Sequence, residues 1–201
     1  MTDKLNALEI PVNTLFRASD LPLHPDLDVV LETLVTSGDI DRVAPGLYWR
    51  GSATRFGRIS ASARQIVTHL YGPRSGLGSA GLSAVNGLGL STQVPGHESF
   101  AVPHPCGFER WGVRLVDRSH RAARAVERLS FVEVTILEAL DDEDWWEYSP
   151  TRVYDRLAEV ITRCGDEVDL ARLERGAATE ESATRAHLAG VLSRLSSPGA
   201  A

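Results

Sequence analysis

The segment SGDIDRVAPGLYWRGSATRFGR, residues 37–58, contains the pattern from which the fold of the N-terminal domain is predicted. Short apolar and aromatic runs cover residues 40–43 and 47–49, and Pro45-Gly46 separates them. Proline followed by glycine favours a tight turn, and aromatic residues are common in strands. The segment therefore predicts a small β-hairpin.

Two helices are predicted before this hairpin. Residues 12–21 are expected to form a short first helix. Pro25 suits the first turn of a second helix, in which apolar residues recur at helical spacing over 27–35 and Gly38 follows as a cap. Two helices and a hairpin are the outline of a winged helix-turn-helix domain, which we place at residues 1–58.

Residues 59–201 are predicted to form a second domain that is mostly helical and contains a small sheet. Helices are expected from residue 60 to the Gly72-Pro73 pair, around 79–85, and over 131–140, 149–164, 168–173 and 180–195, with strands over 100–102 and 112–116 and a basic helix or loop over 118–128. The predicted fold class is accordingly α+β.

Charge is distributed unevenly along a chain whose formal net charge is -6. Residues 1–41 carry eight acids against Lys4 and Arg17, whereas residues 42–97 carry six arginines and no acid. Residues 129–201 carry fifteen acids against seven arginines. A basic centre between two acidic ends indicates contact with a polyanion.

Four arginines lie on the predicted hairpin or directly after it, where a wing would follow the phosphate backbone or enter the minor groove of DNA. These candidate DNA-binding residues are Arg42, Arg50, Arg55 and Arg58. The second helix, which would normally enter the major groove, offers Asp26, Asp28 and Glu32 and no basic side chain. Two interpretations therefore stay open: the wing alone binds double-stranded DNA, or the module docks onto a protein.

No complete metal site or catalytic constellation is predicted. His97, His104 and Cys106 are three possible ligands, which do not close a tetrahedral site. The glycine-rich run GPRSGLGSAGLS, residues 72–83, lacks the Gly-Lys-Ser/Thr ending of a phosphate-binding loop, so we expect its small residues to permit close packing. Neither Ser79 nor Ser83 has a partnered base beside it in the sequence.

The run DDEDWWEY, residues 141–148, combines five acids with two tryptophans. Such a run is typical of a solvated helix end, but it could also hold a metal for a hydrolase or contact a partner protein. The residues considered for partner contact are Asp141, Asp142, Glu143, Asp144, Trp145 and Trp146.

Four further segments carry a family resemblance: Arg42-Val43 through Gly46-Leu47-Tyr48, SAGLSAVNGLGLSTQVP (79–95), SFAVP (99–103) and ATRAHLAGVLSRL (183–195). Together they resemble the corresponding segments of the AbiEi family of bacterial antitoxins. The resemblance implies an N-terminal winged helix that binds operator repeats and represses its own promoter. It also implies a C-terminal region that counters a toxin resembling a nucleotidyltransferase, and it transfers no active-site residue.

The expected function is therefore that of an antitoxin and autoregulating repressor. Its expected partners are operator DNA and the cognate nucleotidyltransferase-like toxin, with no cofactor, no metal and no membrane. We expect a cytoplasmic protein, since no window approaches the roughly 18 apolar residues of a membrane span and Cys106 and Cys164 do not suggest a disulfide framework. The alternatives are a ligand-responsive repressor with a pocket near Trp145 and Trp146, and a metal-dependent hydrolase that uses the acids at 141–144.

Overall fold

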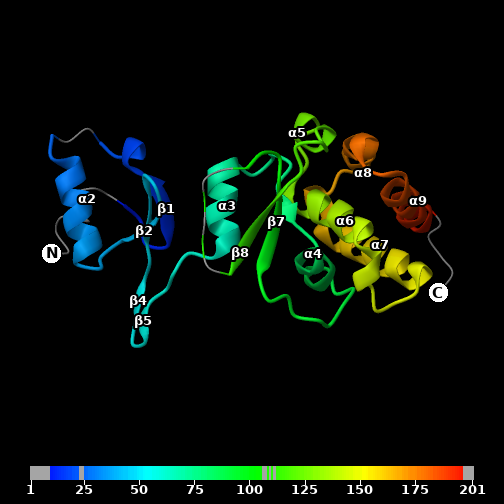
Figure 1. Cartoon of the computed structure of the whole chain (residues 1–201), viewed down its shortest axis with the longest axis horizontal. Coiled ribbons are helices and arrows are strands. Elements are labelled where there is room, and N and C mark those ends of the chain that lie inside the picture. Colours follow the sequence, from blue (N-terminus) through cyan, green and yellow to red (C-terminus); the bar gives the residue numbers. More distant parts are fainter. Residues whose placement is uncertain (1–9, 23–24, 106–107, 109, 111, 197–201) are drawn as a thin grey trace. The chain divides into compact units, whose positions relative to one another are not determined.

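The computed structural model describes residues 10–22, 25–105, 108, 110 and 112–196. The chain divides into two compact units, Met1–Leu70 and Tyr71–Ala201, and its fold class is α+β (Figure 1). The division lies twelve residues beyond the predicted boundary after Arg58. The polar segment at 51–57 lies within the first unit and contains paired strands.

The first unit contains a three-stranded antiparallel sheet and, before the hairpin, one described α-helix. The strands are β1 (Thr14–Arg17), β2 (Asp41–Ala44) and β3 (Leu47–Arg50), in the order β1-β3-β2, and the helix is α2 (Leu27–Thr36). The predicted hairpin is thus confirmed as β2 and β3. The central strand is buried from Leu47 to Trp49, which fits its run of large apolar residues.

The predicted helix over residues 12–21 is wrong. Strand β1 occupies its centre and pairs residue by residue with β3, with Phe16 opposite Tyr48. Only a 3-10 turn, η1 (Ala18–Asp20), follows the strand. Phe16 is buried and its ring stacks on Tyr48 at 5.6 Å, so pairing and burial in the sheet outweigh the local helical pattern.

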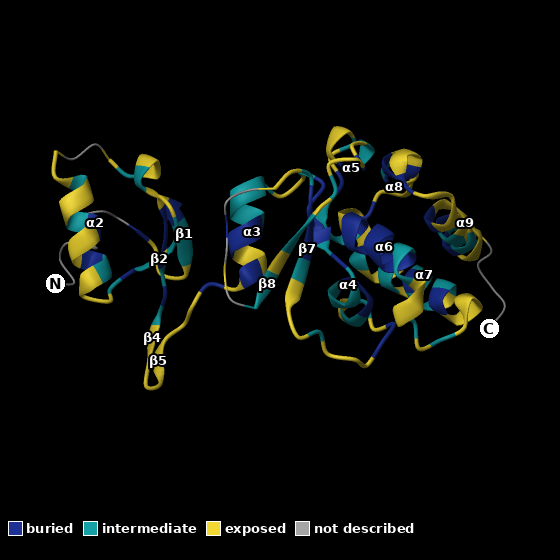
Figure 2. Cartoon of the chain, in the orientation of Figure 1, coloured by how far each residue is buried: buried dark blue, intermediate teal, exposed yellow. Residues whose placement is uncertain are grey.

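Helix α2 forms as predicted because one of its faces is fully apolar. Leu31 and Leu34 are completely buried, and they pack in one cluster with Ile10, Phe16 and Ile40. Gly38 follows the helix with a φ of 73°, a left-handed conformation that glycine adopts without strain. Figure 2 shows the alternation of buried and exposed residues along this helix.

A second hairpin follows the sheet and was not predicted. Its strands are β4 (Ala53–Thr54) and β5 (Gly57–Arg58), with Arg55 and Phe56 at the turn. The Thr54 hydroxyl donates to the Gly57 carbonyl at 2.7 Å and accepts from the Phe56 amide at 3.2 Å. Helix α3 (Ala63–Tyr71) then leads to the end of the unit.

The second unit consists of a small sheet and a helical layer. Its strands are β6 (Gly78–Ser79), β7 (Glu98–Val102) and β8 (Val113–Asp117), in that order, with β7 antiparallel to β6 and parallel to β8. Its helices are α4 (Leu82–Gly87), α5 (Ala123–Val126), α6 (Phe131–Asp141), α7 (Pro150–Cys164), α8 (Leu170–Gly176) and α9 (Ser182–Ser196), with 3-10 turns η2 (Glu143–Trp145), η3 (Gly165–Glu167) and η4 (Ala177–Thr179).

Helix α6 forms the centre of the second unit, and every residue from Glu133 to Leu140 is buried. A capping box starts it: Ser130 accepts from the Glu133 amide, and the Glu133 carboxylate accepts from the Ser130 amide. Strand β6, helix α4 and helix α9 all contact α6. Among the described residues, no helix is both long enough and apolar enough to cross a membrane.

Candidate functional site

Arg42 is the first of the four predicted DNA-binding arginines, and it is partly neutralised by the preceding helix. Its guanidinium pairs with the Glu32 carboxylate of α2 and lies over the Tyr48 ring at 5.6 Å. The Arg42 side chain keeps 44% of its surface exposed. The charge of Arg42 is therefore accessible to solvent, but the Glu32 carboxylate partly neutralises it.

Arg50 and Arg58 both make contacts that stabilise the first unit. Arg50 donates to the backbone carbonyl of Ile10. Arg58 donates to the Gly51 carbonyl at 3.0 Å and pairs with Asp39 at 3.1 Å. Arg50 thus connects β3 to the segment before β1, and Arg58 connects β5 to Gly51 and Asp39, so substituting either arginine changes structure as well as charge.

Arg55 differs from the other three arginines. It lies at the turn of the β4–β5 hairpin, and its guanidinium carbon is 4.5 Å from the centre of the Phe56 ring. No ion pair within the described part of the chain involves it. Phe56 is 84% exposed, the largest exposure of any large apolar residue described. Phe56 was not predicted as a site residue; the available signal was an apolar residue between Arg55 and Gly57 in a turn-like segment.

The exposed face of α2 is apolar and acidic. Asp28, Val29, Glu32, Thr33 and Thr36 line a shallow depression on it, and Val29 is 66% exposed. Helix α2 itself carries no basic side chain that could bind a phosphate. The structure thus places Asp28 and Glu32 of the predicted second helix on its solvent side.

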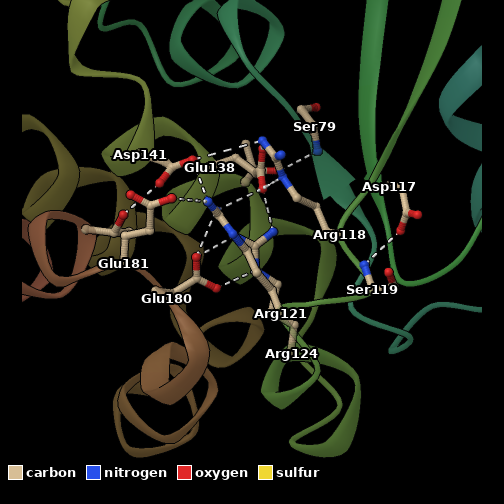
Figure 3. A network of polar contacts seen from close by, with 12 residues as sticks. Ser79, Asp117, Arg118, Ser119, Arg121, Arg124, Glu138, Asp141, Glu180 and Glu181 are labelled. Carbon is tan, nitrogen blue, oxygen red and sulfur yellow. Dashed lines mark hydrogen bonds and ion pairs between the residues drawn. The ribbon is translucent and has the colours of Figure 1, made fainter.

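The second unit contains a buried ion-pair network (Figure 3). Arg124 is almost fully buried and donates to both oxygens of Glu180 at 2.6 and 2.8 Å and to Glu138 at 2.5 Å. Arg118 donates to the two oxygens of Glu138 at 2.8 and 2.9 Å. Bidentate contacts between guanidinium and carboxylate are the strongest ion pairs that proteins form.

Arg121 adds Asp141 to the network and also contacts Glu180. Its Nη2 lies 2.8 Å from Asp141 and its Nη1 lies 2.9 Å from Glu180. Three arginines therefore meet three buried or half-buried acids, and the cluster is close to neutral. Its arginines follow β8, whereas its acids come from α6 and from the chain before α9, so it joins segments far apart in sequence.

The network shifts the pKa values of its acids in opposite directions. Burial alone would raise the pKa of Glu138 and Asp141, but the arginines beside them hold both values below the ordinary range. Asp142 shows the reverse: burial, with the charges of Glu138 and Asp141, raises its pKa to about 6. Its Oδ2 is buried without a hydrogen-bond partner among the described residues.

A pocket of about 280 Å³ lies at the carboxyl ends of the parallel strands β7 and β8. His104, Arg118, Ser119, Arg121 and Arg124 are among the residues that line it. Ligands of parallel sheets commonly bind at this edge. Here the three arginines are already paired with acids of the same unit, which leaves little free positive charge for an anion.

The six residues considered for partner contact do not share one surface. Asp141 accepts from Arg121 and from the Thr184 hydroxyl, each at 2.8 Å, so it belongs to the network. Trp146 is partly buried and donates to the Ala139 carbonyl at 2.8 Å. The members that face solvent are Glu143, Asp144 and Trp145.

The acids at 141–144 also do not converge on one point. Glu143 contacts His187 at 3.1 Å, whereas Asp141 faces the arginines. Among the described residues, no group of three or more His, Cys, Asp or Glu side chains could hold a metal ion. Of the three possible ligands of a tetrahedral site, Cys106 lies outside the described residues, and the His104 ring packs against the Tyr71 ring with 5.2 Å between their centres.

The serines of the glycine-rich run have structural contacts. Ser83 donates to the His97 carbonyl at 3.2 Å and accepts from the Ser99 amide at 3.0 Å. The run also brings β6 close to α6, because a Cβ at Gly78 would lie 2.7 Å from the Thr135 amide nitrogen. The prediction that small residues here permit close packing is confirmed.

Comparison with protein-family models and with curated protein sequences finds no match to this chain. Among solved structures, a crystal structure of the RV2827C protein from Mycobacterium tuberculosis aligns with a TM-score of 0.47 and 15% sequence identity. The alignment covers 98% of this chain and 76% of that chain. Similarity at this level assigns no function.

Proposed function

We propose that this chain is the antitoxin and autoregulating repressor of a two-gene bacterial toxin–antitoxin system. In this proposal the first unit binds operator DNA, and the second unit counters a toxin that resembles a nucleotidyltransferase. The sequence resemblance to AbiEi antitoxins, carried by residues 42–48, 79–95, 99–103 and 183–195, supports it.

The observation that carries the DNA-binding half is the β4–β5 hairpin. It presents Arg55 to solvent within residues 42–97, a stretch without a single acid in the sequence. An arginine that has no acidic neighbour along the chain can give its full charge to a phosphate.

The topology of the first unit supports a winged-helix interpretation. Helix α2 is followed directly by the β2–β3 hairpin, and strand β1 pairs with β3, which gives the sheet order β1-β3-β2. In a winged helix, a helix precedes such a hairpin, and the hairpin contacts the backbone or minor groove. The 3-10 turn η1 occupies the position at which a winged helix-turn-helix domain usually has a longer helix.

The acidic face of α2 favours DNA contact by the hairpins over contact by this helix. Asp28 and Glu32 would lie against phosphates if α2 entered the major groove, and like charges there repel. The same face, with Val29 exposed, favours the second interpretation of this helix, in which it docks onto a protein.

The second unit is suited to act as a rigid binding platform. Its buried ion pairs connect the chain after β8 to α6 and to the segment before α9, and its exposed acids at Glu143 and Asp144 flank Trp145. A toxin that handles nucleotides or RNA would present a basic surface, which these acids complement. We propose that this unit binds its partner and has no catalytic activity of its own.

A ligand-responsive repressor is the second candidate. The pocket at the ends of β7 and β8 favours it, although this pocket is lined by Arg118 and Arg121 and not by Trp145 and Trp146 as the sequence led us to expect.

Fluorescence anisotropy with a duplex from directly upstream of the gene tests the main proposal. Log affinity should fall linearly with log salt, because binding releases counterions from the phosphates. A chain that shows no salt-dependent binding to this duplex at micromolar concentrations is not its repressor.

A further inference from the structure

The exposure of Phe56 is unexplained by the folding of the first unit. Its side chain is 84% exposed, whereas Phe16 and Trp49 of the same unit are buried. Large aromatic side chains normally contribute to stability through burial, so one held in solvent at the end of a hairpin suggests a binding role.

The turn holds Phe56 outward without using its side chain. Thr54 and Gly57 determine the turn geometry: the Thr54 hydroxyl bonds both the Gly57 carbonyl and the Phe56 amide, and Gly57 takes a φ of 115°. Because the side chains of Arg55 and Phe56 are not needed for the turn, small polar residues would serve there equally well. Their presence at this point is therefore better explained by what they contact.

The neighbouring charge identifies the class of partner. The Arg55 guanidinium lies over the Phe56 ring at 4.5 Å, and the surrounding sequence from Arg42 to His97 contains no acid. A basic residue beside a projecting apolar one is the combination that minor-groove proteins use: the arginine binds in the groove or at the phosphates, and the apolar side chain wedges between base pairs.

We propose that the tip of the β4–β5 hairpin binds the minor groove of double-stranded DNA and inserts Phe56 as a wedge at a flexible base-pair step. Arg55 contacts the adjacent phosphates. This inference rests on the DNA-binding half of the proposed function and adds that DNA is deformed on binding, so that sequence preference comes in part from deformability.

The test uses the full chain and the upstream duplex, with 2-aminopurine placed in turn at its TA and CA steps. Wild-type protein should raise the 2-aminopurine fluorescence at one step, because a wedge unstacks the base. Phe56→Ala should abolish this rise and weaken binding by roughly tenfold, the scale of losing one aromatic–base stack, without changing the salt slope. Phe56→Trp should retain both.

Matched controls separate the wedge from general effects. Val94→Ala removes another exposed apolar side chain, 83% exposed and in the same acid-free stretch, and should change nothing. Arg55→Ala should lower the salt slope by about one unit, whereas Arg74→Ala, which removes an exposed arginine elsewhere in that stretch, should not.

The outcomes distinguish the wedge from the repressor function. If wild-type protein binds the duplex but Phe56→Ala binds equally well and no step brightens, the wedge is wrong and the repressor proposal stands. If the wild-type protein fails to bind the duplex at low salt, both are wrong. If Phe56→Ala instead weakens binding of the toxin and leaves DNA binding intact, the tip is a protein-docking element and the wedge is overturned.

Discussion

Arg124 donates to both carboxylate oxygens of Glu180, at 2.6 and 2.8 Å, although 56 positions separate the two residues in the sequence. The exposed fraction is 2% for the Arg124 side chain and 0% for the Glu180 side chain. The pair connects α5 to the segment just before α9, and a third buried residue, Glu138 of α6, shares the guanidinium. The ion pair thus joins three segments of the second unit at one point.

Arg124→Met should therefore destabilise the second unit by about 3 kcal/mol, because it leaves buried carboxylates with less compensation. Arg194→Met, which breaks an exposed pair with Asp155, should cost less than about 1 kcal/mol. Urea unfolding followed by tryptophan fluorescence measures both. Equal costs for the two variants would show that the buried pair has no special weight.

The raised pKa of Asp142 predicts that the second unit becomes less stable as the pH rises. Its pKa rises from an ordinary 3.8 to about 6 in the folded chain, so between these values the folded state holds a proton that the unfolded state has released. The free energy of unfolding should consequently fall as pH rises from about 4 to 6. Linkage gives an upper limit near 3 kcal/mol, which partial exposure of the group reduces to about 1 kcal/mol.

Asp142→Asn should remove this fall and should be more stable than the wild type above pH 7. Glu138 and Asp141 act in the opposite direction, because their lowered pKa values give stability that is lost only below about pH 4. Urea unfolding of both proteins at pH 4.5, 6 and 8 separates the effects. Parallel pH profiles for variant and wild type would exclude Asp142 as the source.

Two glycines of the second unit predict opposite responses to alanine. A Cβ at Gly78 would lie 2.7 Å from the backbone nitrogen of Thr135, so Gly78→Ala must push β6 away from α6 and should cost about 2 kcal/mol. At Gly87, in helix α4, no neighbouring atom lies within 4 Å of the position that a Cβ would take, and alanine should be neutral or stabilising by up to about 1 kcal/mol. Thermal unfolding of the two variants compares them directly.

Local patterns predicted the elements whose burial is determined by their own sequence. Helix α6, helix α7 after Ser149 and Pro150, and the β2–β3 hairpin were all expected near their observed bounds. Strand β1 was missed because its conformation depends on pairing with β3, more than thirty residues later, and no local signal reports such pairing.

The candidate sites were predicted less completely than the fold. The charge count identified an arginine-rich stretch, but only the structure shows that Arg42 is shared with Glu32 and that Arg50 and Arg58 hold the first unit together. The run at 141–144 was treated as one acidic surface, whereas Asp141 points into the network. Sequence gives the charges of side chains and not their partners.

Glu32 provides a test of how α2 takes part in DNA binding. Glu32→Gln releases Arg42 from its ion pair, so affinity for the upstream duplex should increase and the salt slope should grow by about one unit. Asp28→Asn is the control, because it removes an acid from the same face of α2. Among the described residues, Asp28 forms no ion pair. If both variants bind DNA more tightly by the same factor, α2 itself lies near the phosphates; a gain for Glu32→Gln alone assigns the effect to Arg42.

The exposed part of the acidic run predicts where the toxin is bound. Glu143→Ser, Asp144→Ser and Trp145→Ser, combined in the full chain, should slow association with the toxin several-fold and make it less dependent on salt, because the steering charges and the aromatic anchor are lost. Folding should be preserved, because the Glu143 side chain is 60% exposed despite its contact with His187, and Trp145 is 40% exposed. Growth rescue on co-expression with the toxin should fail.

A matched control removes the same charge and a similar apolar area elsewhere on the second unit. Glu159→Ser, Asp166→Ser and Leu170→Ser take away two exposed acids and one side chain that is 39% exposed. This variant should associate and rescue like the wild type. Asp141→Ser should lower the unfolding temperature, because Asp141 accepts from Arg121 and Thr184, so a loss of rescue there reports instability and not contact. Full rescue by the first triple variant would place the toxin on another surface of the chain.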